Sequence, residues 1–390
     1  MKHPLNVLYL IRAWALGGSH TIIRLFLKHL PKDEFNIVTV PYDAPGPGNR
    51  DFIDSVRREG GQVAPERIPW NSRFNYVRAL HTIDQIVDKY HIDLIHTHDT
   101  QSNVMVGLHR RRWNCAAVGS PYGWWEPRWH LQARSYHWVE KNMALPNFER
   151  VYTVSEDMKR KVLRGRTPEE RIRVIHTGLD LARFDGGAAR EEVRAQLGIP
   201  RNALVAGTVS RLFKEKGHAH LIEAARRVMP ECPHLWLLVV GTGDEAGALA
   251  RQAETCGVAD RTVFTGFYQD LPGALRAMDI FVQPSVLEEG FPTAVLEAQV
   301  MGLPVIASDI GGTHETLVED KTGLLVPPGD SVALAYALTQ LLRDDERRAA
   351  MGRAARPWIE NAFTLQHMLA RIAETYREAY AAYHGQQGEA

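Results

Sequence analysis

The chain has few cysteines and no net charge. Only three cysteines occur in 390 residues, Cys115, Cys232 and Cys256. An odd number without metal-ligand spacing argues against a disulfide framework and suits a reducing compartment. Lysine plus arginine equals aspartate plus glutamate, 46 against 46. This balance argues against a global polyanion-binding role, so we expect no nucleic-acid partner.

Long apolar runs are also absent. No stretch approaches the roughly 20 apolar residues that a membrane-spanning helix needs. The N-terminal segment "MKHPLNVLYLIRAW" is interrupted by Arg12, and its apolar run is too short for a secretory signal, so it is typical of a first strand. We therefore expect a cytoplasmic protein whose membrane contact, if it has one, is peripheral on the inner face.

The neutral total hides an asymmetry between the two halves. Residues 1–184 contain about 27 basic and about 19 acidic side chains, so this half carries roughly +8 and the remainder roughly −8. The positive half fits a phosphate-bearing ligand, an anionic membrane surface, or complementarity between the halves. The count alone leaves all three open.

Short apolar runs alternate with segments of helical period along the whole chain. The runs are residues 6–11, 36–40, 93–98, 115–120, 150–155, 203–210, 235–241, 261–267, 279–285 and 304–308. Runs that are apolar on both faces are typical of central parallel strands. The length and a break at residues 181–200 predict two doubly wound α/β domains, residues 1–182 and 183–363, with a helix at 364–384 crossing back onto the first. The default ligand site is a cleft where the domains face each other.

The stretch "SVLEEGFPTAVLEAQVMGLPVIAS", residues 285–308, places two carboxylates around a helix start. Gly290 permits a turn, and Pro292 and Gly302 predict a helix over about 292–301. Glu289 precedes this helix and Glu297 lies in its second turn. Such an arrangement suits a ligand with hydroxyls at each end and phosphate between, as in a nucleotide sugar. Seen alone, the two glutamates could merely cap and solvate the helix start.

This segment resembles the E-x7-E motif of family 4 glycosyltransferases, which have the GT-B fold. The resemblance implies that Glu289 orients the donor sugar, that Glu297 holds the ribose and that the turn between them binds the diphosphate. N–H groups of residues 291, 293 and 294 would assist, whereas Pro292 has none to donate. The donor-binding residues of this turn are Gly290, Phe291, Pro292, Thr293 and Ala294.

The segment "TVSRLFKEKGHAHLIEA", residues 208–224, is similar to the part of this family that supplies two cations to the diphosphate. Those positions are Arg211 and Lys216. Fixed cations can neutralise charge on the departing diphosphate, a task that other transferases give to a metal. No D-x-D motif occurs, so we expect no metal and no further cofactor. Without the resemblance, both residues could be ordinary surface cations.

Three further segments extend the resemblance. Gly17 and Gly18 in "RAWALGGSH" match the glycine loop of the first domain, and they lack the full G-x-G-x-x-G pattern of a dehydrogenase. Gly243 in "LLVVGTGDEAGAL" matches a turn near the nucleotide base. The backbone around Phe267 and Tyr268 could pair with the base edge, although aromatic residues at a strand end are often core packing.

The chain departs from the family pattern where a histidine is expected in the cleft. Tyr122 in "CAAVGSPYGWWEP" stands at that position, and it can donate a hydrogen bond but cannot become a cation near neutral pH. Because of this departure, the chain could also be a relative of the family that has lost catalytic activity. His96 and His98 in "DLIHTHD" share one face of a strand, which suggests either a metal pair or, as the resemblance favours, a packed strand end beside the cleft.

Tryptophan is concentrated in the first half. Trp124, Trp125 and Trp129 could form a stacking platform for sugar rings of the acceptor, or fill the core. The basic run "LHRRRW", residues 108–113, could touch a bilayer or form a solvated helix end.

These features together predict a retaining glycosyltransferase. The second domain would bind a UDP-, GDP- or ADP-sugar, and the first domain a carbohydrate or lipid-linked acceptor. An acceptor hydroxyl would attack the anomeric carbon on the face that the diphosphate leaves. The alternatives are a sugar-nucleotide epimerase of the same architecture and a binding protein without turnover.

Overall fold

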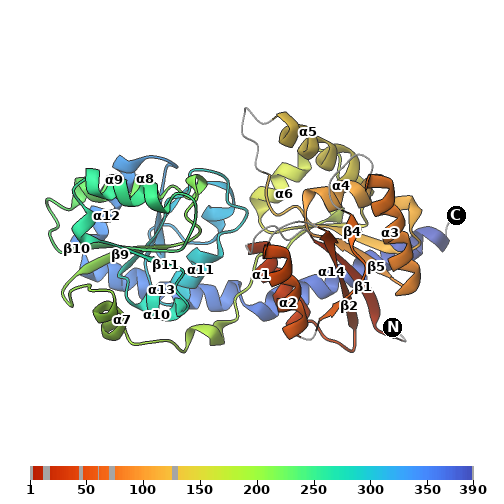
Figure 1. The fold of residues 1–390 in the computed structure, drawn as a ribbon, viewed down its shortest axis with the longest axis horizontal. Helices are drawn as coiled ribbons and strands as arrows, with labels where there is room; N and C mark the ends of the chain where they lie inside the picture. The colour runs from red at the N-terminus through yellow and green to blue at the C-terminus, as the bar shows by residue number, and fades with distance from the viewer. Residues whose placement is uncertain are drawn as a thin grey trace. The chain divides into compact units, whose positions relative to one another are not determined.

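The structure is a computed structural model that describes residues 3–11, 18–43, 47–59, 61–69, 75–124 and 131–388. The chain divides into two compact units (Figure 1). Unit 1 contains residues 1–177 and 366–390, and unit 2 contains residues 178–365. Each unit is described by itself.

Unit 1 is built on one parallel sheet. Its strands follow the order β3-β2-β1-β5-β6-β7-β8, and β4 pairs with β2. The strands are β1 (Leu5–Ile11), β2 (Phe35–Asp43), β3 (Gln62–Val63), β4 (Ile68–Pro69), β5 (Leu94–Thr97), β6 (Ala116–Gly119), β7 (Arg150–Thr153) and β8 (Ile172–Val174). The helices are α1 (Gly18–His29), α2 (Pro47–Arg58), α3 (Asn75–Lys89), α4 (Thr100–Leu108), α5 (Leu131–Val139), α6 (Glu156–Leu163) and α14 (Leu365–Gly388). Residues on both faces of β5 and β6 are fully buried, as expected for central parallel strands.

Polar contacts hold the C-terminal helix α14 to the rest of unit 1. Glu378 pairs with Arg150 and Arg173, each at 2.7 Å, and the hydroxyl of Tyr376 lies 2.7 Å from that of Tyr9 on β1. The last described part of the chain is therefore packed against one of the first strands.

Unit 2 is a second parallel sheet, with strand order β11-β10-β9-β12-β13-β14. Its strands are β9 (Leu204–Val209), β10 (Leu235–Val240), β11 (Thr262–Gly266), β12 (Ile280–Gln283), β13 (Val305–Ser308) and β14 (Gly323–Val326). Its helices are α7 (Arg190–Gln196), α8 (His218–Val228), α9 (Ala246–Thr255), α10 (Leu271–Arg276), α11 (Thr293–Val300), α12 (Ser331–Arg343) and α13 (Asp345–Ala362). Two doubly wound parallel-sheet domains confirm the predicted fold class.

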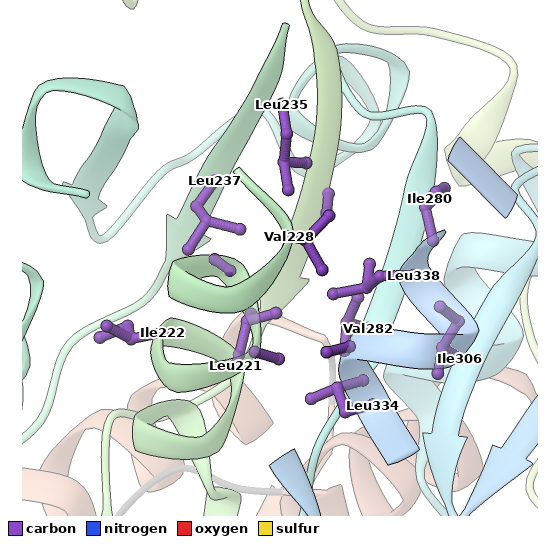
Figure 2. Packing of buried hydrophobic residues seen from close by; sticks show 14 of the residues in the cluster. Leu221, Ile222, Val228, Leu235, Leu237, Ile280, Val282, Ile306, Leu334 and Leu338 are labelled. Carbon is purple, nitrogen blue, oxygen red and sulfur yellow. The ribbon is translucent and has the colours of Figure 1, made fainter. Parts of the chain in front are cut away.

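The core of unit 2 fills the space between its sheet and the pair α8 and α12 (Figure 2). Leu221 and Val228 of α8 meet Leu334 and Leu338 of α12 over strand residues that are equally buried. This packing supports the carboxyl ends of β9 and β12, from which the candidate site is built.

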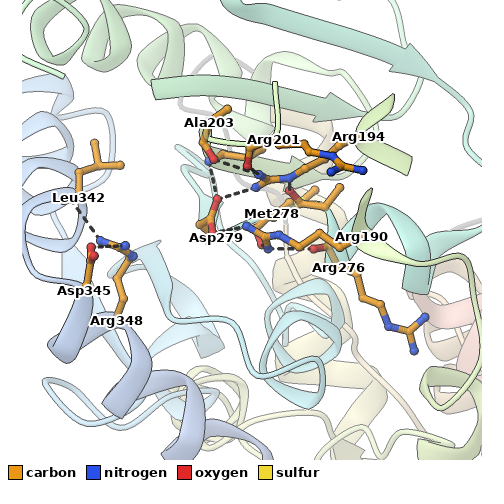
Figure 3. A network of polar contacts seen from close by, with 12 residues as sticks. Arg190, Arg194, Arg201, Ala203, Arg276, Met278, Asp279, Leu342, Asp345 and Arg348 are labelled. Carbon is orange, nitrogen blue, oxygen red and sulfur yellow. Dashed lines mark hydrogen bonds and ion pairs between the residues drawn. The ribbon is translucent and has the colours of Figure 1, made fainter. Parts of the chain in front are cut away.

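The amino-terminal edge of the same sheet is tied together by one carboxylate. Asp279, just before β12, accepts hydrogen bonds from Arg190 at 2.5 Å and Arg194 at 2.7 Å (Figure 3). It also accepts a hydrogen bond from the backbone N–H of Val205 at 2.8 Å. The Arg194 side chain is only 3% exposed. Because a buried charge left without its partner is costly, this contact fixes α7 to the sheet.

Removal of this carboxylate should destabilise unit 2. We expect Asp279→Ala to lower the free energy of unfolding by about 2–4 kcal/mol, because Arg194 would remain buried without its counter-charge. Urea unfolding followed by circular dichroism measures this. Glu231→Ala is the matched control, since Glu231 and its partner Arg343 are 66% and 60% exposed, and its loss should cost less than about 1 kcal/mol. Equal losses in the two variants would contradict the structural role.

Candidate active site

The loop between β9 and α8 carries both predicted phosphate-binding cations, Arg211 and Lys216. Gly217 ends this loop with φ of +67°, and a Cβ at this position would lie 1.9 Å from the carbonyl oxygen of Pro284. Only glycine permits this conformation and this close approach. The N–H of Val286 also donates to the carbonyl of Glu215 at 2.9 Å. The loop after β9 is therefore packed against the loop after β12 and hydrogen-bonded to it.

The two glutamates of the E-x7-E motif lie on either side of the start of α11. Pro292 has an extended ψ of 100° and precedes the first helical residue, Thr293. The helix thus begins one residue later than the sequence predicts, because Pro292 occupies the cap position. Glu289 lies in the loop before the helix, and Glu297 lies in its second turn.

Glu289 is held by a dense set of hydrogen bonds. Its Oε1 accepts from Lys216 Nζ at 2.6 Å, from Ser285 Oγ at 2.6 Å and from Gln283 Nε2 at 3.1 Å. Among the described residues no donor reaches Oε2, which leaves that oxygen available to a ligand. The structure therefore brings together Lys216 and Glu289, and it adds Ser285 and Gln283, which the sequence reasoning missed.

A glycine pair after β13 supports Glu289 from the other side. The N–H of Gly312 donates to the carbonyl of Glu289 at 2.8 Å. Gly311 has φ of +57°, and a Cβ there would lie 2.2 Å from the same carbonyl oxygen. The "GG" in "SDIGGTHE" is the sequence signal that could have identified this support, because paired glycines often mark a close backbone approach.

Glu297 is half-buried, and burial raises its pKa to about 7. The positive charge of Arg183 acts in the opposite direction. The carboxyl group is therefore close to half-protonated at neutral pH, and a ligand that donates hydrogen bonds to it would favour the ionised form. Arg183 is another residue that sequence reasoning did not select.

The other charged and polar side chains of the loop between β9 and α8 differ in their environment. Arg211 is exposed, and its guanidinium lies 4.9 Å from the centre of the Phe213 ring. His218, at the start of α8, is buried and its Nε2 lies 2.9 Å from Ser210 Oγ. Burial, together with the charge of Lys216, lowers the pKa of His218 to about 4. His218 is therefore neutral near pH 7, so the cations of this loop are Arg211, Lys214 and Lys216.

The predicted base-binding residues lie beyond β10 and β11. A Cβ on Gly243 would lie 2.3 Å from the carbonyl oxygen of Leu212, so glycine lets this turn pack against the Arg211 loop. Phe267 is 81% exposed, and the Tyr268 hydroxyl donates to Gln196 at 3.4 Å. Phe267 is therefore surface-exposed, not core packing.

Several of the residues predicted for the first domain lie outside the described residues. These are Gly17, Trp125 and Trp129, while Gly18 is the first residue of α1. Trp124 is 4% exposed, and its indole N–H donates to Glu140 at 2.7 Å. A buried indole offers no stacking face in this conformation, so we do not retain Trp124 as an acceptor residue.

Tyr122 and the two histidines meet at the carboxyl edge of the unit 1 sheet. His96 is bonded through both ring nitrogens, to Tyr376 and to Ser120, each at 2.6 Å. The Tyr122 hydroxyl lies 2.9 Å from Nδ1 of His98. Nowhere in the described ranges do three or more histidine, cysteine or carboxylate side chains gather as a metal site requires. This arrangement is the packed strand end, not the metal pair.

The basic run at residues 108–113 is less exposed than its sequence suggests. Arg110 is buried and donates to both carboxylate oxygens of Glu149, at 3.0 and 2.9 Å. Arg112 is exposed and pairs with Asp84 at 2.6 Å. Two of the three arginines in this run therefore have carboxylate partners, and one of the two, Arg110, is buried.

A solved structure has the same fold as this chain. The crystal structure of HepE from Anabaena in complex with UDP superposes with a TM-score of 0.84, at 23% sequence identity, over 95% of this chain and 99% of HepE. Two parallel-sheet α/β domains with this likeness define the GT-B fold.

The sequence comparisons give the family. The profile "Glycosyltransferase Family 4" matches residues 16–183, and "Glycosyl transferases group 1" matches residues 189–358. A D-inositol 3-phosphate glycosyltransferase from Corynebacterium urealyticum is 31% identical over 304 residues, 73% of this chain and 71% of the relative. A UDP-Gal:alpha-D-GlcNAc-diphosphoundecaprenol alpha-1,3-galactosyltransferase from Escherichia coli is 27% identical over 93% of this chain and 94% of the relative. The chain belongs to glycosyltransferase family 4, which confirms the resemblance.

The raised pKa of Glu297 predicts a pH-dependent penalty on stability. The folded state binds the proton more tightly than the unfolded state, so stability falls as pH rises from about 4.5 to above 7. Glu297→Gln should therefore be more stable than the wild type at pH 8, by about 1–2 kcal/mol, since partial solvent access reduces the full effect. At pH 4.5 the two proteins should be alike.

Thermal unfolding of both proteins at pH 4.5 and pH 8 measures this difference. Glu231→Gln, on the exposed surface, is the control for loss of a carboxylate. A gap between wild type and Glu297→Gln that does not change with pH would rule out the ionisation as its cause.

Proposed function

We propose that this protein transfers a sugar from a nucleoside diphosphate sugar to an acceptor hydroxyl with retention of anomeric configuration. Unit 2 holds the donor at the carboxyl ends of β9 and β12, and unit 1 holds the acceptor. Fixed protein cations, rather than a metal, stabilise the leaving diphosphate. The observation that carries the proposal is the contact between Lys216 and Glu289, with the second oxygen of Glu289 available.

Glu289 orients the donor sugar through Oε2. Its other oxygen accepts three hydrogen bonds, so the carboxylate is held in one orientation before any ligand arrives. A carboxylate oxygen accepts hydrogen bonds from sugar hydroxyls. Preorganisation of this kind lowers the cost of positioning the anomeric carbon.

Lys216 and the start of α11 bind the diphosphate. The ammonium group has three donors, and Glu289 uses one, so the others remain for phosphate oxygens. The backbone N–H groups of residues 291, 293 and 294 supply the positive end of the helix dipole. Gly290 and Pro292 shape this turn, and Arg211 adds a second cation from an exposed position. Charge that develops on the leaving group is therefore met by fixed donors.

The proposal also assigns the contacts to the ribose, the base and the acceptor. Glu297 accepts from the ribose hydroxyls, and the backbone at Gly243, Phe267 and Tyr268 meets the base. We also propose Gly17 and Gly18 as donor-binding residues that offer backbone N–H groups to the diphosphate. Trp125 and Trp129 are the retained candidates for stacking on the acceptor.

The relatives suggest which donor to test first. The Escherichia coli relative is named for UDP-Gal and a diphosphoundecaprenol-linked acceptor, and HepE was crystallised with UDP. A GDP-mannose-dependent mannosyltransferase of Mycobacterium tuberculosis is 33% identical over 54% of this chain. We therefore place UDP-sugars first and GDP-sugars second, with a carbohydrate or lipid-linked hydroxyl as acceptor. Neither the epimerase nor the inactive alternative is favoured by these relatives.

Membrane contact remains a proposal for the acceptor side. Within the described ranges, no helix combines the length and the apolar character needed to cross a bilayer. We propose that a lipid-linked acceptor is reached by peripheral contact, for which the net positive charge of residues 1–184 is suited.

Loss of either member of the central pair should abolish most turnover. We expect Lys216→Ala and Glu289→Gln each to lower kcat by about 10²–10³-fold, because each removes a fixed interaction with the transition state. Release of UDP or GDP from a panel of nucleotide sugars, in the presence of candidate acceptors, measures this.

Lys214→Ala is the matched control, because Lys214 lies in the same 3-10 turn but is exposed. It should retain nearly full activity, and circular dichroism should show that all three variants are folded at the assay temperature. Wild-type turnover in both Lys216→Ala and Glu289→Gln would refute the assignment. Binding of nucleotide sugars without release, across all acceptors, would favour the inactive alternative.

The ribose contact predicts that UDP binding depends on pH. Ribose hydroxyls that donate to Glu297 stabilise its carboxylate, so binding should lower the pKa from about 7 and release protons. The affinity for UDP should therefore increase severalfold between pH 6 and pH 8, and Glu297→Gln should remove most of this increase. Calorimetric titration at the two pH values measures it. The same pH dependence in Glu297→Gln would place the ribose elsewhere.

A further inference from the structure

A cavity of about 830 Å³ lies in unit 1 among the segments that precede three neighbouring strands. Of the residues that line it, Trp113 comes shortly before β6, Glu149 directly before β7 and Arg171 directly before β8. The cavity is therefore at the amino-terminal edge of the sheet. Strand β6 has four residues, so about 13 Å of strand separates this edge from the carboxyl edge, where Tyr122 lies.

The lining of this cavity is strongly basic. Four arginines, Arg110, Arg111, Arg112 and Arg171, line it together with one carboxylate, that of Glu149. Glu149 accepts hydrogen bonds from the buried Arg110 on both of its oxygens, and Arg112 is paired with a carboxylate outside the lining. In the described part of the chain, no carboxylate forms an ion pair with Arg111 or Arg171. Two positive charges of the cavity are therefore left without a counter-charge.

Arg171 is held in place by contacts that leave its charge unpaired. Its Nη1 donates to the backbone carbonyls of Pro146 and Phe148, at 2.9 and 3.4 Å, and the residue is half-buried. No acceptor of the described ranges is bonded to Nε or Nη2, so the N–H groups of these two nitrogens remain available. Such a guanidinium edge is arranged for a ligand with two adjacent oxygens.

Arg110 and Tyr383 form a fixed side of the cavity. The Arg110 guanidinium lies 5.1 Å from the centre of the Tyr383 ring and donates to the carbonyls of Trp113 and Cys115. The ring of Tyr383, which comes from α14, gives the cavity an apolar surface beside its cations.

Phosphate chemistry fits this lining best. Guanidinium groups bind phosphate through paired N–H donors, because the oxygens of phosphate match their planar geometry. The volume of the cavity lies in the range of small-molecule sites, which leaves room for an organic group attached to the phosphate. A phosphate ester would use both the unpaired arginines and the surface of Tyr383.

We propose that this cavity is a binding site for a phosphate ester, whose phosphate oxygens are bound by Arg111 and Arg171. The ester is either a soluble compound or the headgroup of an anionic lipid, since both present the same phosphate. The site goes beyond the proposed function and does not depend on it, because all of its residues belong to the amino-terminal edge of unit 1 and to α14.

Calorimetric titration with glycerol 3-phosphate at low ionic strength tests the soluble source. Arg111→Gln and Arg171→Gln should each weaken binding about tenfold, because each removes charge-assisted hydrogen bonds to the phosphate. The affinity of the wild type should fall as sodium chloride is added, because Arg111 is exposed and its charge is screened.

Two control variants locate the binding. Arg67→Gln removes an exposed arginine before β4, which pairs with β2 at the other end of the same sheet, and should leave the affinity unchanged. Lys216→Ala should also leave it unchanged, which excludes binding of the probe to the loop after β9. Conversely, Arg111→Gln should bind UDP like the wild type. Failure of the proposed function and failure of this site are therefore seen in different measurements.

Co-sedimentation with vesicles tests the lipid source. Vesicles of equal parts phosphatidylcholine and phosphatidylglycerol are compared with vesicles of phosphatidylcholine alone. Binding of glycerol 3-phosphate identifies a soluble ligand, and binding to the phosphatidylglycerol vesicles alone identifies a headgroup. Either result supports the proposal if Arg111→Gln and Arg171→Gln weaken the binding and Arg67→Gln does not.

Three results would overturn the proposal. These are no binding of either probe to the wild type, binding that Arg111→Gln and Arg171→Gln leave unchanged, and binding that is lost in Lys216→Ala instead. If Arg171→Gln does not fold, Arg111→Gln decides the outcome, because the Arg111 side chain is exposed and forms no hydrogen bond with other described residues. Circular dichroism checks that each variant is folded.

Discussion

The ion pair between Lys216 and Glu289 is the contact on which the candidate site of unit 2 depends. The two side chains come from loops that follow different strands, so their 2.6 Å separation requires both loops to be held in place. Gly217 and Gly311 permit backbone approaches that a side chain would prevent, and a hydrogen bond between Glu215 and Val286 joins the loops. The pair is therefore preorganised by the backbone, which limits the rearrangement needed when a diphosphate binds.

The amino-terminal edge of the unit 2 sheet contributes to stability, whereas its carboxyl edge carries the candidate site. At the amino-terminal edge, Asp279 joins Arg190 and Arg194 to the strand starts, and these three charged groups are paired with one another. At the carboxyl edge, Glu289 keeps one oxygen and Lys216 keeps donor capacity for a ligand. Parallel strands make this division possible, because all their carboxyl ends meet at one edge. Stability and ligand binding can then be changed by different residues.

Unit 1 has a set of connected, buried polar side chains at the carboxyl edge of its sheet. Tyr376 of α14 is bonded to His96 of β5, which lies 280 positions earlier in the sequence. The C-terminal helix thereby contributes to the orientation of groups next to Tyr122 and His98. Connected buried networks of this kind specify one arrangement, because each member loses its hydrogen bond if another moves.

The sequence by itself determined the two parallel sheets, the helix after the E-x7-E turn and the family. Runs that are apolar on both faces, and proline and glycine at a helix boundary, act locally and can be recognised without coordinates. It did not indicate the short strands β8 and β14, the burial of Trp124, the partners Gln283 and Ser285 of Glu289, or the unpartnered nitrogen of His98. Burial and hydrogen-bond partners were decided only by tertiary structure, because they depend on which distant segments meet.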